Sequence, residues 1–147
     1  MHALSTRLEA TQLEALADAV DVVVDGSDNF ATRFAVNAAC VATQTPLVAA
    51  AVIGMDGQLA VFRPEQGGPC YRCVFEDTGE EALSCSETGV LGPLPGVMGS
   101  LQAVETIKVL TDLGTPLNSR LLINDALSQS WRRLDLRIDP DFPVCQR

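Results

Sequence analysis

The spacing of hydrophobic residues divides the first third of the chain into helical and extended segments. Residues 4–19 carry leucine and alanine at helical spacing among polar residues, which predicts an amphipathic helix. Residues 20–26, VDVVVDG, hold four valines with little alternation, a pattern typical of a parallel strand buried on both faces. A helical pattern over 30–43 follows, and the apolar run 46–54 predicts a second buried strand.

The next elements are a hairpin strand, a long helix and two late strands. Residues 55–64 alternate in polarity after Asp56-Gly57, which predicts a turn followed by a strand that pairs with the preceding one. The clearest helix covers 95–114, where Pro95 suits the first turn and Gly114 the C-terminal cap. Two more strands are predicted over 120–125 and 128–137.

This order of elements predicts one α/β domain with a mixed sheet over residues 1–147. A doubly wound nucleotide-binding fold normally opens with a strand, a glycine-rich turn and a helix. The chain has no GxGxxG motif and opens with a helical pattern instead. The sequence therefore predicts a Rossmann-like domain that is truncated at its N-terminal side.

Composition narrows the function classes. The net charge of −9 disfavours a nucleic-acid-binding role, which requires a basic face. No apolar run is long enough to span a membrane, and the N-terminal residues lack the apolar core of a secretory signal. Five cysteines, an odd number, disfavour a disulfide framework. We therefore expect a cytoplasmic protein that binds neither nucleic acid nor membrane.

Asp28 and Asn29 follow the first predicted strand and begin the next helix, within DGSDNFATR. Ligands of open α/β sheets bind beyond the carboxyl ends of the strands. A carboxylate there could hold Mg²⁺, which prefers oxygen ligands and bridges to phosphates. The alternative is structural, because Asp and Asn are preferred helix N-caps and Asp28 could serve only as a cap.

Cysteine spacing indicates a metal site with an incomplete ligand set. Cys70 and Cys73 form a CxxC pair, and structural zinc sites usually combine two such pairs. Cys145 is the only remote cysteine that fits, because Phe142 stands where the second pair would begin. The fourth ligand could be water, His2 or nothing, and the alternative is a set of ordinary thiols in a degraded site.

Cys85 lies in a long glycine-, proline- and glutamate-rich stretch without a clear period, residues 64–94. A cysteine in an exposed loop could act as a nucleophile or persulfide carrier. Acidic neighbours would raise the pKa of its thiol, so an inert surface cysteine is the alternative.

Three motifs in this order resemble the ThiF/MoeB/HesA family of E1-like adenylyltransferases. They are VVVDGSDNFATRFAVNAAC, GGPCYRC with LSCSETGVLGPLPGVMGSLQAVETIKVL, and the terminal SQSWRRLDLRIDPDFPVC. The resemblance implies an E1-like fold, a mobile crossover loop over 74–89 and a homodimer. It also implies ATP- and Mg²⁺-dependent adenylation of the C-terminal glycine of a small ubiquitin-like sulfur carrier with a Gly-Gly end. Such carriers serve molybdopterin, thiamin or tRNA thiolation.

The resemblance also assigns roles to residues. Asp28 would bind ATP and Mg²⁺ with Asn29 beside it, and Cys70, Cys73 and Cys145 would bind structural zinc. Cys85 stands where some members have a cysteine that takes part in acyl or persulfide transfer. The family's glycine-rich turn and phosphate-binding basic residues have no counterpart in the chain. Two alternatives therefore remain: a non-catalytic carrier-binding or dimerisation module, and an inactive truncated gene product.

Overall fold

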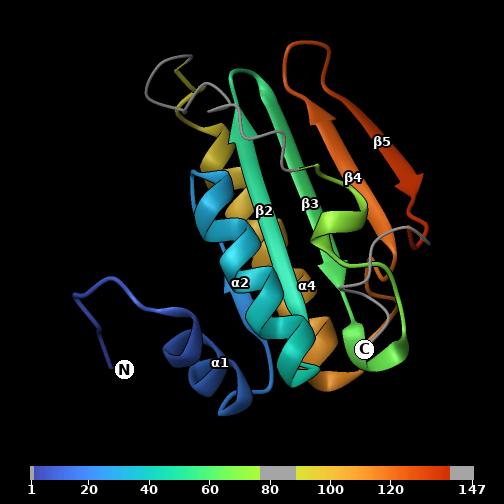
Figure 1. Ribbon diagram of the computed structural model, residues 1–147. Coiled ribbons are helices and arrows are strands. Elements are labelled where there is room, and N and C mark those ends of the chain that lie inside the picture. The colour runs from blue at the N-terminus through green and yellow to red at the C-terminus, as the bar shows by residue number, and fades with distance from the viewer. Residues whose placement is uncertain (1, 77–88, 140–147) are drawn as a thin grey trace.

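A computed structural model describes residues 2–76 and 89–139, and it shows a sheet between two helical layers (Figure 1). The sheet lies in the order β1-β2-β3-β4-β5. The elements are α1 (Ala10–Asp18), β1 (Val23–Asp25), α2 (Phe30–Thr43), β2 (Leu47–Ile53), β3 (Asp56–Phe62), η1 (Pro64–Gln66), η2 (Tyr71–Cys73), α4 (Leu94–Thr111), β4 (Arg120–Asp125) and β5 (Ser130–Asp135).

The sheet is mixed, as the order of elements predicts. Strand β1 pairs in parallel with β2, whereas the β2–β3, β3–β4 and β4–β5 pairs are antiparallel. The predicted hairpin is confirmed, because Leu47 pairs with Phe62 and Ile53 pairs with Asp56. The carboxyl ends of the parallel strands β1 and β2 therefore lie at the same end of the sheet. The antiparallel strands β3, β4 and β5 widen the sheet on the other side of β2.

Helices cover both faces of this sheet. Helix α2 lies against one face and α4 against the other (Figure 1). Strand alternation assigns neighbouring residues to opposite cores: Leu47 and Ala49 pack with Phe34 of α2, whereas Val48 packs with Met98 of α4. The apolar run of β2 is therefore explained by burial on both faces.

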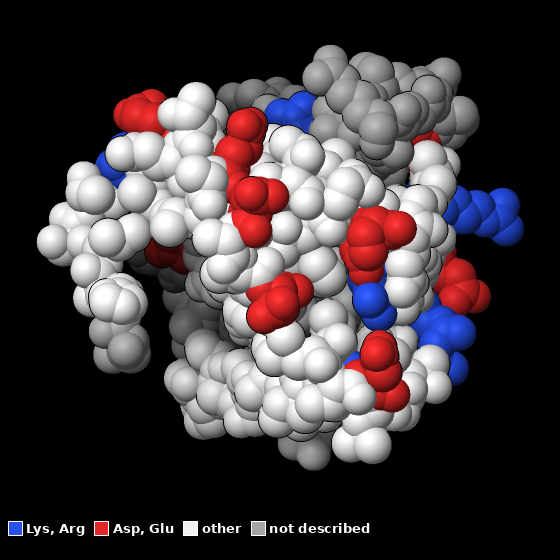
Figure 2. Space-filling view, turned by 90° about the horizontal axis from the view of Figure 1, so that it is seen from below, with Lys and Arg blue, Asp and Glu red and all other residues white. Residues whose placement is uncertain are grey.

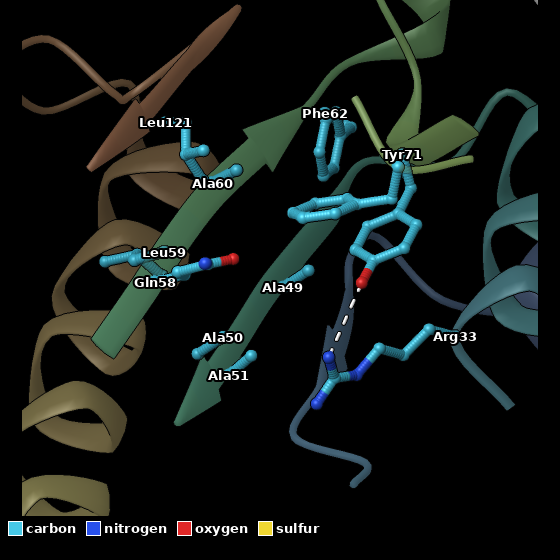
Figure 3. A pocket seen from close by; sticks show the side chains of 11 residues that line it. Arg33, Ala49, Ala50, Ala51, Gln58, Leu59, Ala60, Phe62, Tyr71 and Leu121 are labelled. Carbon is cyan, nitrogen blue, oxygen red and sulfur yellow. Dashed lines mark hydrogen bonds between the residues drawn. The ribbon is translucent and has the colours of Figure 1, made fainter. Parts of the chain in front are cut away.

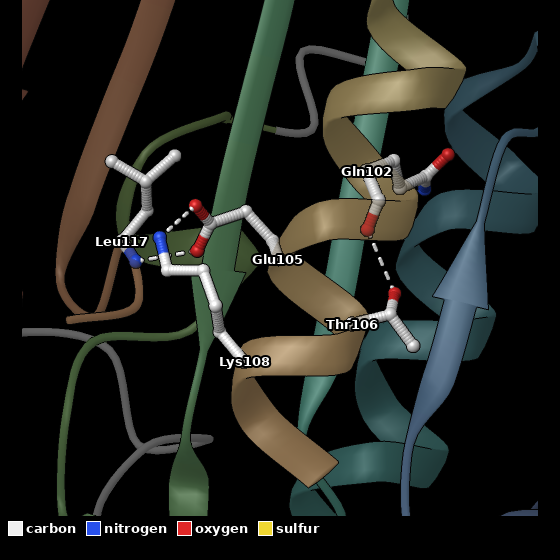
Figure 4. Close-up of polar contacts among 5 residues, drawn as sticks. All are labelled: Gln102, Glu105, Thr106, Lys108 and Leu117. Carbon is white, nitrogen blue, oxygen red and sulfur yellow. Dashed lines mark hydrogen bonds and ion pairs between the residues drawn. The ribbon is translucent and has the colours of Figure 1, made fainter. Parts of the chain in front are cut away.

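Buried polar side chains fix helix α4. The Glu105 carboxylate accepts hydrogen bonds from the Leu117 backbone N–H at 2.8 Å and from Lys108 Nζ at 2.5 Å, as Figure 4 shows. Gln102, one turn earlier, is also buried and donates to backbone carbonyls of the sheet. A buried carboxylate or amide is stabilised only when it is hydrogen-bonded, so these contacts define the position of α4.

The first two predicted elements are shorter than the pattern indicates. The helix expected over 4–19 covers Ala10–Asp18, and the strand expected over 20–26 covers Val23–Asp25. That strand was expected to be buried on both faces, but Val24 is 50% exposed. Within the described ranges, β1 pairs only with β2, so it is an edge strand.

Two glycines do not have the positions that the sequence predicts for them. The hairpin turns at Gly54 and Met55, so the predicted turn at Asp56-Gly57 is wrong, and both of those residues lie in β3. Helix α4 ends at Thr111, and its cap is Asp112 in the left-handed region at φ 53°. Gly114 is therefore not the helix cap that the sequence predicts.

The surface is acidic. Figure 2 shows carboxylate side chains spread across the lower end of the molecule, in keeping with the net charge of −9. Among the described residues, no helix combines the length and the apolar character that a membrane crossing requires.

Gly57 is required for core packing, and this can be tested. A Cβ at this position would lie 2.5 Å from Met98 Sδ and 2.8 Å from Met98 Cγ, and Met98 is fully buried. We expect Gly57→Ala to lower the free energy of unfolding by about 1–3 kcal/mol through overpacking, measured by urea denaturation. Gly96→Ala is the control, because an added Cβ there meets nothing within 4 Å. An equal loss in both variants would contradict this account.

Candidate functional site

A cleft of about 230 Å³ lies at the carboxyl ends of the two parallel strands. Its walls come from the loop after β1, the second half of β2 and the N-terminal half of α4. The lining residues are Gly26, Ser27, Asp28, Arg33, Ala50, Ala51, Val52, Val90, Pro95, Met98, Gly99 and Gln102. This is the edge at which open α/β sheets bind ligands.

Asp28 and Asn29 have different positions relative to the cleft. Asn29 is the N-cap of α2, and its Oδ1 accepts a hydrogen bond from Thr32 N at 2.8 Å. Asp28 lines the cleft and is exposed, with Oδ1 accepting from Asn29 Nδ2 at 3.3 Å. The cap that the sequence allowed for Asp28 is thus supplied by Asn29, and the Asp28 carboxylate remains accessible to a ligand.

Arg33 lines the cleft but is not among the site residues predicted from the sequence. Arginines on helix faces are usually solvated or ion-paired, but Arg33 is only 6% exposed. Its Nε and Nη2 donate to the Ser27 carbonyl oxygen at 3.0 and 2.6 Å, and its guanidinium lies 5.6 Å from the Phe30 ring centroid. Its place in DNxxTR, one turn into the helix after the Asn cap, was the available signal.

The loop between β1 and α2 is held from both sides. Asp25 is buried at the end of β1, and its Oδ1 accepts from Ser27 N at 2.9 Å. Arg33 holds the carbonyl of the same serine. The hydroxyl of Ser27 is buried and has no hydrogen-bond partner within residues 2–76 and 89–139.

Arg33 also reaches an aromatic cluster. Figure 3 shows its Nη1 directed at the Tyr71 hydroxyl, which lies 3.5 Å away. Tyr71 packs edge-on against Phe34 and Phe62 and stacks on Phe75 with a centroid distance of 4.5 Å. Burial raises the pKa of the Tyr71 phenol, and the hydrogen bond from Arg33 partly offsets that rise. The phenol is therefore neutral at physiological pH.

Two of the predicted zinc ligands lie next to this cluster. Cys70 is buried and Cys73 half-buried, at the two ends of the turn that contains η2. Asn37 of α2 accepts from Tyr71 N at 2.9 Å, and its Nδ2 lies 3.7 Å from Cys70 Sγ. Over the described part of the chain, no three His, Cys, Asp or Glu residues gather as a metal site. Cys145 lies outside that part, as do Phe142 and most of the predicted crossover loop.

Cys40 and Cys85 are not among the described residues that line the cleft. Cys40 is buried within α2, as expected for a small hydrophobic residue, and burial raises the pKa of its thiol to about 12. It is therefore a protonated, inert thiol. Cys85, the predicted transfer cysteine, lies outside the described residues, so its role stays a prediction.

Comparison with known proteins identifies the family. The ThiF family model matches residues 1–145. The chain belongs to the ThiF family. It is 48% identical to the Escherichia coli sulfur carrier protein ThiS adenylyltransferase, over 99% of this chain and 57% of that protein. It is 44% identical to the E. coli molybdopterin-synthase adenylyltransferase, over 94% of this chain and 55% of that protein. The chain thus spans about half the length of the curated relatives it matches.

Solved structures agree on the fold. E. coli MccB in a crystal structure with ATP superposes with a TM-score of 0.77 at 18% identity, covering 97% of this ThiF-family chain and 44% of MccB. MccB with succinimide gives the same TM-score. At this identity the likeness establishes the E1-like fold alone, which confirms the fold class predicted from the sequence.

The different positions of Asp28 and Asn29 predict different effects on stability. Asn29→Ala removes the N-cap of α2 and should lower the free energy of unfolding by about 1 kcal/mol. Asp28→Ala removes an exposed carboxylate and should change it by less than about 0.5 kcal/mol. Urea denaturation of both variants measures this. A loss for Asp28→Ala as large as that for Asn29→Ala would show that Asp28 has a structural role.

Proposed function

We propose that this chain forms part of an enzyme that uses Mg²⁺ and ATP to adenylate the C-terminal glycine of a small ubiquitin-like sulfur carrier. The observation that carries the proposal is the placement of an accessible carboxylate, Asp28, in a cleft at the carboxyl ends of parallel strands. The names of the relatives, adenylyltransferases of ThiS and of molybdopterin synthase, support the substrate class.

Asp28 fits a magnesium ligand. Its carboxylate is exposed in the cleft, accepts one hydrogen bond from Asn29 and forms no ion pair with a described residue. Bound Mg²⁺ would neutralise charge on the ATP phosphates, which lowers the barrier to displacement at the α-phosphorus. Asn29 would act beside it by fixing the start of α2, and with it the orientation of Asp28.

The carrier supplies the second reactant. We propose that a carrier ending in Gly-Gly inserts its terminus into the cleft, so that its carboxylate attacks the α-phosphorus and pyrophosphate leaves. The Cys85 thiol, as the proposed transfer residue, would displace AMP from the acyl adenylate to form a thioester. A sulfide-level sulfur donor would then release the thiocarboxylate for molybdopterin, thiamin or tRNA thiolation and restore the thiol. A homodimer is part of the same proposal.

We propose zinc as a structural cofactor bound through Cys70, Cys73 and Cys145. The CxxC turn presents two cysteines together, and an amide N–H of Asn37 directed at Cys70 is the type of outer contact that orients a thiolate ligand. In residues 2–76 and 89–139, no third His, Cys, Asp or Glu lies close enough to Cys70 and Cys73 to complete a metal site. Any further protein ligand would therefore come from outside these ranges.

Pyrophosphate exchange tests the adenylation proposal. Because the chain spans 57% of the E. coli ThiS adenylyltransferase, the matched segment of that enzyme is replaced by this chain, and a carrier ending in Gly-Gly is supplied. We expect Mg²⁺-dependent exchange that Asp28→Ala lowers at least about 100-fold, the size of effect seen when one charge-stabilising group is lost. The 147-residue chain alone is assayed in parallel.

The outcomes separate the alternatives. A folded chimera that binds the carrier but shows no exchange would indicate a non-catalytic binding module. Poor solubility or molten behaviour of the 147-residue chain itself would favour an inactive gene product. Exchange unaffected by Asp28→Ala would remove Asp28 from the magnesium site.

Metal analysis tests the zinc proposal. We expect about one zinc per chain after purification without added metal, and loss of most of it in Cys70→Ser. Cys40→Ser is the control, because it makes the same thiol-to-hydroxyl change at a buried cysteine of α2 that is not one of the proposed ligands. Metal contents of the wild-type protein near zero, or equal in the two variants, would contradict the assignment.

A further inference from the structure

The Arg33 guanidinium is buried with part of its hydrogen-bonding capacity unused. It has five N–H groups, of which Nε and Nη2 use one each on the Ser27 carbonyl and Nη1 uses one on Tyr71. The other two N–H groups have no acceptor among the described residues. No carboxylate of the described residues forms an ion pair with it. The buried Asp25 carboxylate holds the Ser27 N–H and forms no ion pair with Arg33. A buried cation without a directly paired anion is unfavourable, so binding of an anion here would be stabilised.

This cation belongs to the cleft, and so does an unsatisfied hydroxyl. Arg33 and Ser27 both line the cleft, and Ser27 Oγ is buried without a hydrogen-bond partner in the described ranges. The peptide of Ser27 is itself fixed by Asp25 and Arg33. The cleft therefore contains a rigid group of donors, one charged and one neutral, that suits a small anion.

The rest of the lining indicates which anion fits. Arg33 is the only basic residue among the described residues that line the cleft, and Asp28 adds a negative charge. A triphosphate carries several negative charges and needs several cations or metal ions, whereas a peptide C-terminus carries one. Small residues, Gly26, Ala50, Ala51 and Gly99, form much of the remaining wall, which leaves room for a peptide end without side chains.

We propose that Arg33, assisted by the Ser27 hydroxyl, binds the C-terminal carboxylate of the glycine-ended peptide substrate inside this cleft. The assignment rests on the proposed adenylation function and names the residue that recognises the reacting group. Charge-assisted hydrogen bonds to a carboxylate are strong and directional. These hydrogen bonds hold the carboxylate in one orientation for attack. The rate gained by this positioning exceeds the small loss of nucleophilicity that the hydrogen bonds to the carboxylate cause.

Binding of a peptide to the 147-residue chain without ATP tests this proposal. The probe is a labelled heptapeptide ending in Gly-Gly, prepared once with a free C-terminal carboxylate and once as the C-terminal amide, with binding followed by fluorescence anisotropy. We expect the acid to bind at least about tenfold more tightly than the amide. The amide lacks the negative charge and has an NH₂ donor in place of one acceptor oxygen, so it cannot pair with Arg33 as a carboxylate does.

Four variants isolate the residues. Arg33→Gln keeps an N–H donor for the Ser27 carbonyl but removes the charge, and should make acid and amide bind equally. Arg33→Lys keeps a cation and should retain part of the preference. Ser27→Ala should weaken binding of the acid about threefold without affecting the amide. Arg72→Gln is the matched control, because it removes the same charge from a side chain packed on the Phe34 ring outside the cleft, and should change nothing.

The proposal is overturned if wild-type protein binds acid and amide equally, or if folded Arg33→Gln keeps the preference. If Arg33→Gln does not fold, an unchanged preference in Ser27→Ala overturns it. A loss of Mg-ATP binding in the Arg33→Gln chimera equal to its loss of peptide binding would assign the anion as a phosphate and also overturn it. If the acid is bound preferentially but the chimera shows no pyrophosphate exchange, the Arg33 assignment stands and the adenylation proposal fails. If the chimera shows exchange that Arg33→Gln does not affect, the adenylation proposal stands and the Arg33 assignment fails.

Discussion

The contact on which the site depends is made by one side-chain amide. Gln102 Nε2 donates to the Asp25 carbonyl at 2.7 Å and to the Val48 carbonyl at 3.0 Å. These acceptors belong to the two parallel strands, so a single buried group fixes α4 across both. An unsatisfied buried amide would be costly, and this limits the rotation of the helix. The cleft between α4 and the loop after β1 has its shape because of this constraint.

Local patterns predicted most of the elements. Helix 30–43 and strand 120–125 match the observed bounds, because both are encoded by the periodicity of adjacent residues. The exposure of Val24 could not be predicted in this way, since it depends on how many neighbours β1 has in the sheet. The function of Gly57 was equally hidden, because it is set by Met98, which follows 41 positions later (98 − 57) in the sequence.

The sequence placed the candidate site beyond the first strand, but the role of each residue there could be assigned only from the structure. The sequence located Asp28 and Asn29 beyond a strand but could not decide which one caps the helix, since both residue types do so well. The structure gives the cap to Asn29. Arg33 was undervalued because its partners, the Ser27 carbonyl and Tyr71, are brought to it by tertiary folding. Cys85 and Cys145 stay predictions.

Helix α2 connects the two chemical regions of the domain. Its first turn begins beside Asp28, and one turn apart Arg33 and Asn37 both hold the segment that contains Cys70 and Tyr71. The cysteine turn and the cleft are therefore attached to the same rigid rod. During evolution, a change at either end would be transmitted to the other, so positions 33, 37 and 71 should vary together or not at all. Substitutions near the cysteine pair would then be accompanied by substitutions near the cleft, so the two regions would evolve together.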